Sequence, residues 1–180
     1  MLIYLIGFMG CGKSSIGKRL ADRLDFDLVD LDDAITERAG MSIADYFAAR
    51  GEAAFRKLER ETLAETFSME NTVVATGGGV PCHFDNLARI NENGLSIYLK
   101  NDVEFYVDKL LGKTERPLVA GKSEPELRQY IQETLTKREP FYLQAQYVLT
   151  VGNLGKKRTA KIIASIAQAH LSKTDTAEDD

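Results

Sequence analysis

The sequence predicts an α/β fold in which a parallel sheet is covered by helices on both faces. Two observations lead to this prediction. Short apolar runs of the length of buried strands alternate with segments of helical periodicity, and the first run leads directly into a glycine-rich stretch followed by a helix. The expected strands are residues 2–6, 26–31, 72–75, 95–99 and 147–151.

Helical segments are expected between these strands. After the glycine-rich stretch, apolar residues recur at the spacing of one helical face. Residues 33–50 predict two short helices broken at Gly40, with Ser42 placed to cap the second. A longer helix is expected from about residue 52 to residue 67.

Length and composition indicate a single domain over residues 1–171, because 180 residues are enough to bury one core. Residues 112–125 contain two glycines and two prolines without any period, so they are expected to form a loop. Such a segment is typical of a mobile lid over an active site and equally of a passive surface loop. Residues 172–180 are polar and acidic, and a disordered tail is expected there.

Charge and cysteine content exclude several classes of protein. The net charge of −4 argues against nucleic-acid binding, which needs a basic surface. Two cysteines are too few for a disulfide framework or a zinc site, and they fit a reducing compartment. The apolar start of the chain is too short for a membrane span and lacks the basic region of a secretory signal. A cytoplasmic protein without a membrane partner is therefore expected.

The glycine-rich stretch has the spacing of a phosphate-binding loop. Residues 7–14, GFMGCGKS, match the pattern G-x-x-x-x-G-K-[ST] between a strand and a helix. Its glycines let the backbone N–H groups approach a phosphate at the positive end of the helix. Lys13 is expected to reach the outer phosphates and, in the empty loop, to face solvent, while Ser14 can bind Mg²⁺. Cys11 is interpreted as a small filler and not as a nucleophile.

Such a loop occurs in kinases, motor ATPases and GTPases alike. No Asn-Lys-x-Asp sequence for reading guanine is present, which argues against a GTPase switch. The phosphate loop follows the first strand of a chain of 180 residues, so there is little room for domains that would drive a partner. A small kinase is favoured, with its acceptor site built into the same domain.

Two aspartates follow the second predicted strand. Asp30 and Asp32 are two residues apart, so on an extended strand both side chains would point to the same side. Two carboxylates there could hold Mg²⁺ and orient an acceptor hydroxyl. A solvated acidic turn that caps the next helix is an equally good explanation.

Further polar outliers stand later in the chain. Arg56 lies one helical turn before Glu59, which on its own suggests a salt bridge on a solvated face. Three glycines at residues 77–79 follow a buried strand. Ordering three adjacent glycines costs backbone conformational entropy, so the run suggests close approach of a ligand to the backbone. Arg116 and Arg138 could bind carboxylate or phosphate groups if the fold brought them into one cleft.

Taken in order, these motifs resemble the shikimate kinase family over residues 1 to about 170. The matching segments are GFMGCGKSSIG at 7–17, Asp30-Leu-Asp32, GEAAFRKLE at 51–59, VVATGGG at 73–79, ERPL at 115–118 and REPFY at 138–142. The resemblance implies a three-layer P-loop kinase fold like that of nucleoside monophosphate kinases, with a five-stranded parallel sheet and a mobile lid. It implies transfer of the ATP γ-phosphoryl group to the 3-hydroxyl of shikimate, a step of aromatic amino-acid biosynthesis.

The resemblance also implies roles for individual residues. The residues that it implies for ATP binding are Gly10, Cys11, Gly12, Lys13, Ser14, Ser15 and Arg116. Those that it implies for shikimate are Asp32, Arg56, Gly78, Gly79 and Arg138, with the substrate carboxylate among the arginines. Ser14 and Asp30 would serve Mg²⁺, and Lys13, Asp32 and Arg116 would act in catalysis. Lys109 and residues 152–154 fall where the family contacts adenine, and Ser15 stands where it commonly has threonine.

Two other functions are considered beside this one. One is a small kinase of similar build that acts on gluconate or a related hydroxy-acid. The other is a nucleotide-binding regulatory protein with weak ATPase activity, which would need no acceptor site. Lys13, Asp32 and Arg116 together favour a kinase, and a monomer is expected.

Overall fold

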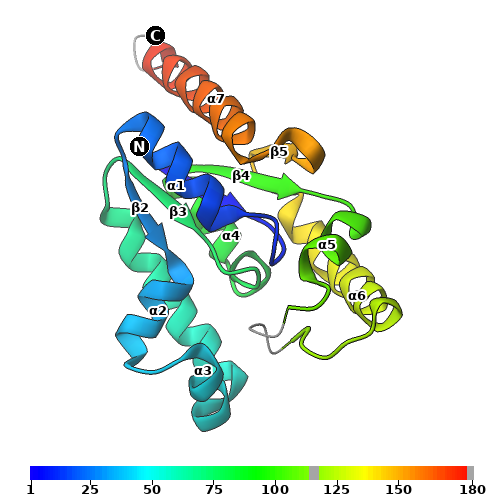
Figure 1. The fold of residues 1–180 in the computed structure, drawn as a ribbon. Coiled ribbons are helices and arrows are strands. Elements are labelled where there is room, and N and C mark those ends of the chain that lie inside the picture. Colours follow the sequence, from blue (N-terminus) through cyan, green and yellow to red (C-terminus); the bar gives the residue numbers. More distant parts are fainter. Residues whose placement is uncertain (114–117, 178–180) are drawn as a thin grey trace.

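A computed structural model of the protein describes residues 1–113 and 118–177 (Figure 1). At its centre is a five-stranded sheet with the strand order β2-β3-β1-β4-β5, in which every neighbouring pair is parallel. The strands are β1 (Leu2–Ile6), β2 (Asp27–Asp30), β3 (Thr72–Ala75), β4 (Leu95–Lys100) and β5 (Tyr147–Thr150). All five expected strands are therefore present, and the expected parallel α/β fold is confirmed.

Helices fill the connections between the strands. The α-helices are α1 (Lys13–Leu24), α2 (Leu31–Ala39), α3 (Ile43–Glu65), α4 (Asn86–Asn93), α5 (Val103–Leu110), α6 (Glu124–Tyr142) and α7 (Lys156–Ala177). Three short 3₁₀ helices add η1 (Thr66–Ser68), η2 (Val80–Cys82) and η3 (Gly152–Leu154). A parallel sheet needs such crossovers, because its strands cannot be joined by tight hairpins.

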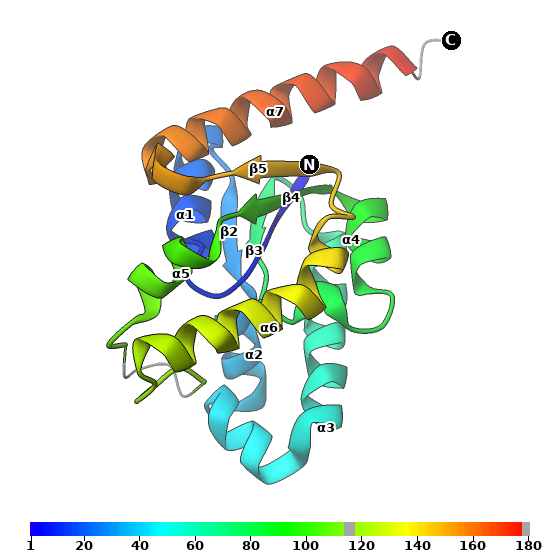
Figure 2. The same cartoon turned by 90° about the vertical axis from the view of Figure 1, so that its right-hand side faces the viewer.

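Helices cover both faces of the sheet (Figures 1 and 2), and alternate residues of a strand point to opposite faces. On one face Leu5 packs beside Gly17 of α1, and α1 in turn packs along α7. On the other face the Tyr4 hydroxyl meets the Thr66 hydroxyl after α3 at 2.9 Å. Three layers result, and strand β1 is fully buried between them, as expected for a central parallel strand.

The pairing register brings three strand ends to one edge of the sheet. Leu5 of β1 pairs with Ala75 of β3, and Asp30 of β2 pairs with the same alanine. The segments that follow these three strands are the phosphate loop, the triple glycine and the start of α2. Ligands of open α/β sheets bind at the carboxyl ends of the strands, so this edge is where a site is expected.

Helices α2 and α3 form an arm that extends beyond this edge of the sheet (Figure 2). Gly40 ends α2, and the Ser42 side chain accepts a hydrogen bond from the Asp45 N–H and so caps α3, as predicted. Gly51 has φ 77° and kinks α3 at the point where the sequence predicts a separate helix to begin.

The predicted loop at residues 112–125 and the predicted tail at residues 172–180 agree with the structure only in part. Residues 118–123 are irregular, as expected for part of a loop, but α6 already begins at Glu124, where Ser123 and Glu126 form a capping box. Residues 114–117, with Arg116, lie outside the described residues. Helix α7 continues to Ala177, so the expected disordered tail from residue 172 is wrong up to that point. The Ser172 hydroxyl bonds to the Gln168 carbonyl one turn back, which a continuing helix allows.

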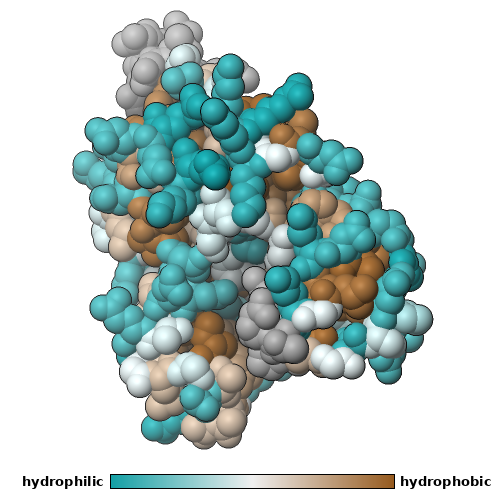
Figure 3. Space-filling view, in the orientation of Figure 1, coloured by the Kyte–Doolittle hydropathy of each residue, from teal (hydrophilic) through white to brown (hydrophobic). Residues whose placement is uncertain are grey.

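On the face shown in Figure 3, hydrophilic side chains predominate over α1 and α7, and apolar residues appear in separate patches. Within residues 1–113 and 118–177, no helix is both long and apolar enough to cross a membrane.

Candidate active site

A cleft of about 570 Å³ opens at the carboxyl edge of the sheet. Every residue that the sequence implies for ATP binding lines it within the described part of the chain, from Gly10 to Ser15. Asp30, Asp32 and Gly78 line it as well. The cleft therefore brings together segments from β1, β2 and β3 that are far apart in the sequence.

The phosphate loop has the backbone that its glycines permit. Gly10 and Gly12 have φ values of 82° and 97°, in the left-handed region that other residues rarely adopt. Lys13 then begins α1, whose positive end faces the cleft. The Lys13 Nζ donates to the carbonyls of Gly7 at 2.8 Å and Phe8 at 3.2 Å, so the expectation of a solvent-facing lysine is wrong. The ammonium group of Lys13 is thus satisfied by carbonyls of the loop itself.

Asp30 and Asp32 do not both lie on an extended strand, as their spacing suggests. Asp30 ends β2 and its Oδ1 accepts from the Asp32 N–H at 3.1 Å, so it caps α2, in whose first turn Asp32 lies. The capping explanation is thus correct for Asp30. Its other oxygen accepts a hydrogen bond from the Ser14 hydroxyl across the cleft. Asp30 therefore has two contacts, one structural and one to the phosphate loop.

The triple glycine makes the closest backbone approaches of the site. A Cβ built on Gly79 would lie 2.6 Å from Nη1 of Arg56, and one on Gly77 would lie 2.8 Å from Oδ1 of Asp32. A Cβ on Gly78 would lie 3.5 Å from Nη1 of Arg138. The fold therefore gathers these polar side chains around one short loop, as the prediction of a crowded backbone implies. The space left by the missing Cβ atoms is occupied by the site's own side chains.

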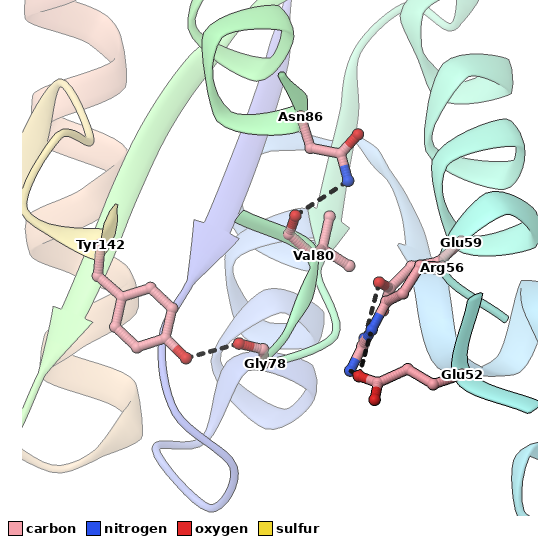
Figure 4. A network of polar contacts seen from close by, with 7 residues as sticks. All are labelled: Glu52, Arg56, Glu59, Gly78, Val80, Asn86 and Tyr142. Atoms are coloured by element: carbon pink, nitrogen blue, oxygen red, sulfur yellow. Dashed lines mark hydrogen bonds and ion pairs between the residues drawn. The ribbon is translucent and has the colours of Figure 1, made fainter. Parts of the chain in front are cut away.

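Arg56 is fixed by two carboxylates from its own helix (Figure 4). Its Nη1 donates to Glu59 at 3.0 Å, and its Nε and Nη2 donate to Glu52 at 3.3 and 3.2 Å. The side chain of Glu59 is 2% exposed, whereas that of Glu52 is 65% exposed. Glu59 is buried and Arg56 is only 14% exposed, so the interpretation of a salt bridge on a solvated face is wrong for this pair.

Glu59 is the site residue whose importance the sequence interpretation missed. It shares the buried face of α3 with Phe55, Thr62 and Leu63, at the spacing i, i+4, i+7 and i+8. A glutamate within that helical stripe is a signal that periodicity could have revealed, because carboxylates are rarely buried unless they are paired.

Burial raises the pKa of Glu59 above its ordinary value of 4.5, and the charge of Arg56 opposes this shift. The folded protein therefore binds a proton at Glu59 more readily than the unfolded chain does. The stability gained from that proton is complete below pH 4.5 and is lost as the pH rises through the raised pKa.

Glu59→Gln is expected to remove this pH dependence, because glutamine does not titrate. The free energy of unfolding of the wild type minus that of the variant should fall as the pH rises from about 4.5, the ordinary carboxyl value. Urea denaturation over a pH series measures this, with Glu61→Gln as the control at an exposed position on the same helix. A difference that grows with pH would mean that Arg56 lowers the pKa of Glu59 below its ordinary value.

The far end of the cleft is lined by residues from α5 and from the segment after β5. They are Phe105, Asp108, Lys109, Val151, Gly152, Asn153, Gly155 and Lys156. Asn101 holds this segment in place, since its Oδ1 accepts from the Gly152 N–H at 2.9 Å. Lys109 and the 152–154 segment, for which the sequence suggests adenine contacts, therefore lie together in the cleft. Arg138 lies beside Gly78, which lines the cleft, and Arg56 lies beside Gly79.

Comparison with known proteins agrees with this architecture. The family model described as shikimate kinase matches residues 9–170. A relative named shikimate kinase from Bacteroides thetaiotaomicron is 41% identical over 153 residues, which cover 84% of this chain and 87% of the relative. A 1.7 Å crystal structure of shikimate kinase from the same organism superimposes with a TM-score of 0.88 at 36% identity, covering 93% of this chain and 98% of that one.

A second solved structure, shikimate kinase from Acinetobacter baumannii in complex with shikimate, has a TM-score of 0.82 at 32% identity and covers 96% of this chain and 93% of that one. The family match spans nearly the whole chain. A phosphate loop facing a triple glycine and two arginines is thus found here within a fold shared with these enzymes. The chain belongs to the shikimate kinase family.

Proposed function

We propose that this protein transfers the γ-phosphoryl group of ATP to the 3-hydroxyl of shikimate, giving shikimate 3-phosphate and ADP. One observation supports this most directly. Gly78 lines the same cleft as the phosphate loop, and its neighbours in the triple glycine lie against Asp32 and Arg56. A nucleotide phosphate and an anionic acceptor would therefore meet at one short loop, which positions them for in-line transfer.

ATP would bind along the cleft with its phosphates in the loop from Gly10 to Ser15. The α1 N-terminus and the loop N–H groups favour a bound anion there. Lys13 would exchange its two loop carbonyls for phosphate oxygens, which are stronger acceptors for an ammonium group. The base would lie toward Lys109 and residues 152–154.

Ser14 and Asp30 fit a magnesium site. Their side-chain oxygens are in hydrogen-bond contact across the cleft, and both are the hard oxygen ligands that Mg²⁺ prefers. In the described part of the chain, no group of three histidine, cysteine or acidic residues is arranged to hold a metal. That agrees with a magnesium ion bound through one or two protein oxygens and completed by phosphates and water. When bound, Mg²⁺ would neutralise charge that develops on the phosphate oxygens.

Shikimate would bind beside the triple glycine. Its carboxylate is an acceptor for the guanidinium groups of Arg56 and Arg138. On Arg56, the edge formed by Nε and Nη2 now holds the exposed Glu52, so a substrate carboxylate would replace one carboxylate with another. The buried Glu59 would keep the opposite edge fixed during this exchange.

Asp32 would orient the attacking hydroxyl and accept its proton. It lies on α2 against Gly77, between the phosphate loop and the triple glycine, and it lines the cleft. Phosphoryl transfer has a loose transition state, so alignment of the hydroxyl matters more than early removal of its proton.

The proposed substrate is tested by measuring ADP release with shikimate, quinate, gluconate and nucleoside monophosphates as acceptors. Shikimate should give the dominant turnover. Dominant turnover of gluconate would instead indicate a related hydroxy-acid kinase. ADP release that is independent of any acceptor would indicate a nucleotide-binding protein with weak ATPase activity.

Arg56→Ala is expected to raise the KM for shikimate roughly ten- to a hundred-fold, because a hydrogen bond to a charged group contributes about 1.5–3 kcal/mol. The KM for ATP should change much less. Arg138→Ala should behave in the same way. A lysine at either position should restore binding only in part, since an ammonium group cannot form the planar two-pronged contact.

Arg60→Ala is the matched control for Arg56→Ala. It lies one turn along α3, and its guanidinium pairs at the surface with Asp85 at 2.8 Å. Its removal should leave both KM values close to those of the wild type. If Arg56→Ala weakened ATP binding and spared shikimate, Arg56 would belong to the nucleotide site.

A further inference from the structure

A buried tyrosine holds the triple glycine from the side opposite Arg56 (Figure 4). The Tyr142 hydroxyl donates to the Gly78 carbonyl at 2.6 Å, and its ring is fully buried. The ring lies against Tyr98 of β4, with the two ring centroids 5.1 Å apart. Burial raises the pKa of Tyr142 well above its ordinary value, so the hydroxyl remains protonated and acts as a donor.

The peptide group between Gly78 and Gly79 connects this hydrogen bond to the proposed acceptor site. A trans peptide group points its C=O and its N–H in opposite directions. The Gly78 carbonyl accepts from Tyr142, so the N–H of Gly79 in the same peptide points away from Tyr142. Arg56 lies on the other side of Gly78 from Tyr142 (Figure 4). A hydrogen bond to the carbonyl also polarises the peptide and strengthens that N–H as a donor.

Tyr142 also links the loop to the helix that carries Arg138. The two residues are four apart on α6, and the Arg138 guanidinium lies beside Gly78. Pro140 lies between them and has no N–H, so this last turn lacks one of its intrahelical hydrogen bonds. The bond from Tyr142 to Gly78 therefore secures the end of α6 at the place where the helix itself is weakened.

We infer that Tyr142 is a positioning residue for the acceptor site: its hydroxyl fixes the Gly78–Gly79 peptide so that the Gly79 N–H faces the bound substrate, and it sets the spacing between this peptide and Arg138. The inference rests on the proposed function, in which Gly78, Gly79 and the two arginines bind shikimate. It adds a residue that contacts neither substrate and acts through the loop.

Tyr142→Phe removes the hydroxyl and keeps the ring, so the peptide loses its anchor. The KM for shikimate is expected to rise about five- to fifty-fold, the scale of one lost hydrogen bond at this partly buried carbonyl. The KM for ATP should change less than about two-fold. In a ¹⁵N–¹H spectrum, the amide resonance of Gly79 should move, because that N–H shares the peptide group with the affected carbonyl.

Tyr4→Phe is the matched control. Tyr4 is also fully buried, and its hydroxyl is hydrogen-bonded to the Thr66 hydroxyl at 2.9 Å and not to the triple glycine. Both variants should lose a similar amount of stability, but only Tyr142→Phe should raise the KM for shikimate. Equal KM values for the two variants, or an unmoved Gly79 resonance, would overturn the inference.

Arg56→Ala, assayed in parallel, separates this inference from the proposed function. If Arg56→Ala raises the KM for shikimate and Tyr142→Phe does not, the acceptor site is correct and Tyr142 has only a structural role. If neither variant changes that KM, the proposed acceptor site itself is wrong.

Discussion

Asp32→Asn is expected to lower kcat by about 10²–10⁴-fold, the usual effect of losing a positioned general base. Asparagine keeps the size of the side chain and one acceptor oxygen, but it cannot take the proton of the attacking hydroxyl. Asp32 lies between the phosphate loop and the triple glycine, where the acceptor would lie. The KM for ATP should remain close to that of the wild type, because the phosphate loop is untouched.

Two other aspartates in the same region make this test specific. Asp33→Asn removes the same charge from the first turn of α2 at an exposed position, so it should leave kcat unchanged. Asp30→Asn should instead raise the magnesium requirement, because Asp30 contacts Ser14. A purely structural Asp32 would give an active Asn variant with a lower Tm, and measuring kcat and Tm on one sample distinguishes the two cases.

Lys13→Ala should lower kcat at least 10²-fold, because it removes a preorganised charge from the transferring phosphoryl group. The structure adds a second expectation. Lys13 donates hydrogen bonds to two loop carbonyls, so the variant should also lose stability on the order of 1 kcal/mol. Rapid-quench or coupled assays give kcat, and urea denaturation gives the stability.

Lys18→Ala is the control, because Lys18 is exposed on α1 and its loss should change neither quantity. A Lys13→Ala variant with nearly normal kcat would mean that the phosphate-loop interpretation is wrong. A variant with no loss of stability would mean that the hydrogen bonds of Lys13 to the loop carbonyls contribute little in solution.

Local patterns predicted the fold and one half of the site. The strands were identifiable because buried parallel strands are short apolar runs, and the phosphate loop because its chemistry needs glycines, a lysine and a hydroxyl at fixed spacing. The break at Gly40 and the cap at Ser42 were likewise local. These features depend on a few neighbouring residues, so a sequence contains them directly.

Features that depend on packing were predicted less well. The i and i+2 spacing of Asp30 and Asp32 suggests that both lie on a strand. The backbone instead enters α2 after Asp30, where the Asp30 side chain accepts from the Asp32 N–H. The sequence interpretation places Glu59 on a solvated face, because the burial of this helix face depends on residues distant in the sequence, among them Gly77. The contact between Tyr142 and Gly78 joins residues 64 positions apart, and no local pattern contains it. The lid over residues 112–125, the role of Arg116, the monomeric state and the cytoplasmic location stay predictions.

The most direct test of the proposed reaction is to identify its product. Purified protein, ATP, Mg²⁺ and shikimate are incubated, and the product is analysed by mass spectrometry and by ³¹P–¹H correlation. The proposal predicts a phosphate monoester whose phosphorus couples to the proton at C3 of shikimate, formed in equal amount with ADP. Phosphate on another hydroxyl, or ADP formed with only inorganic phosphate, would contradict it.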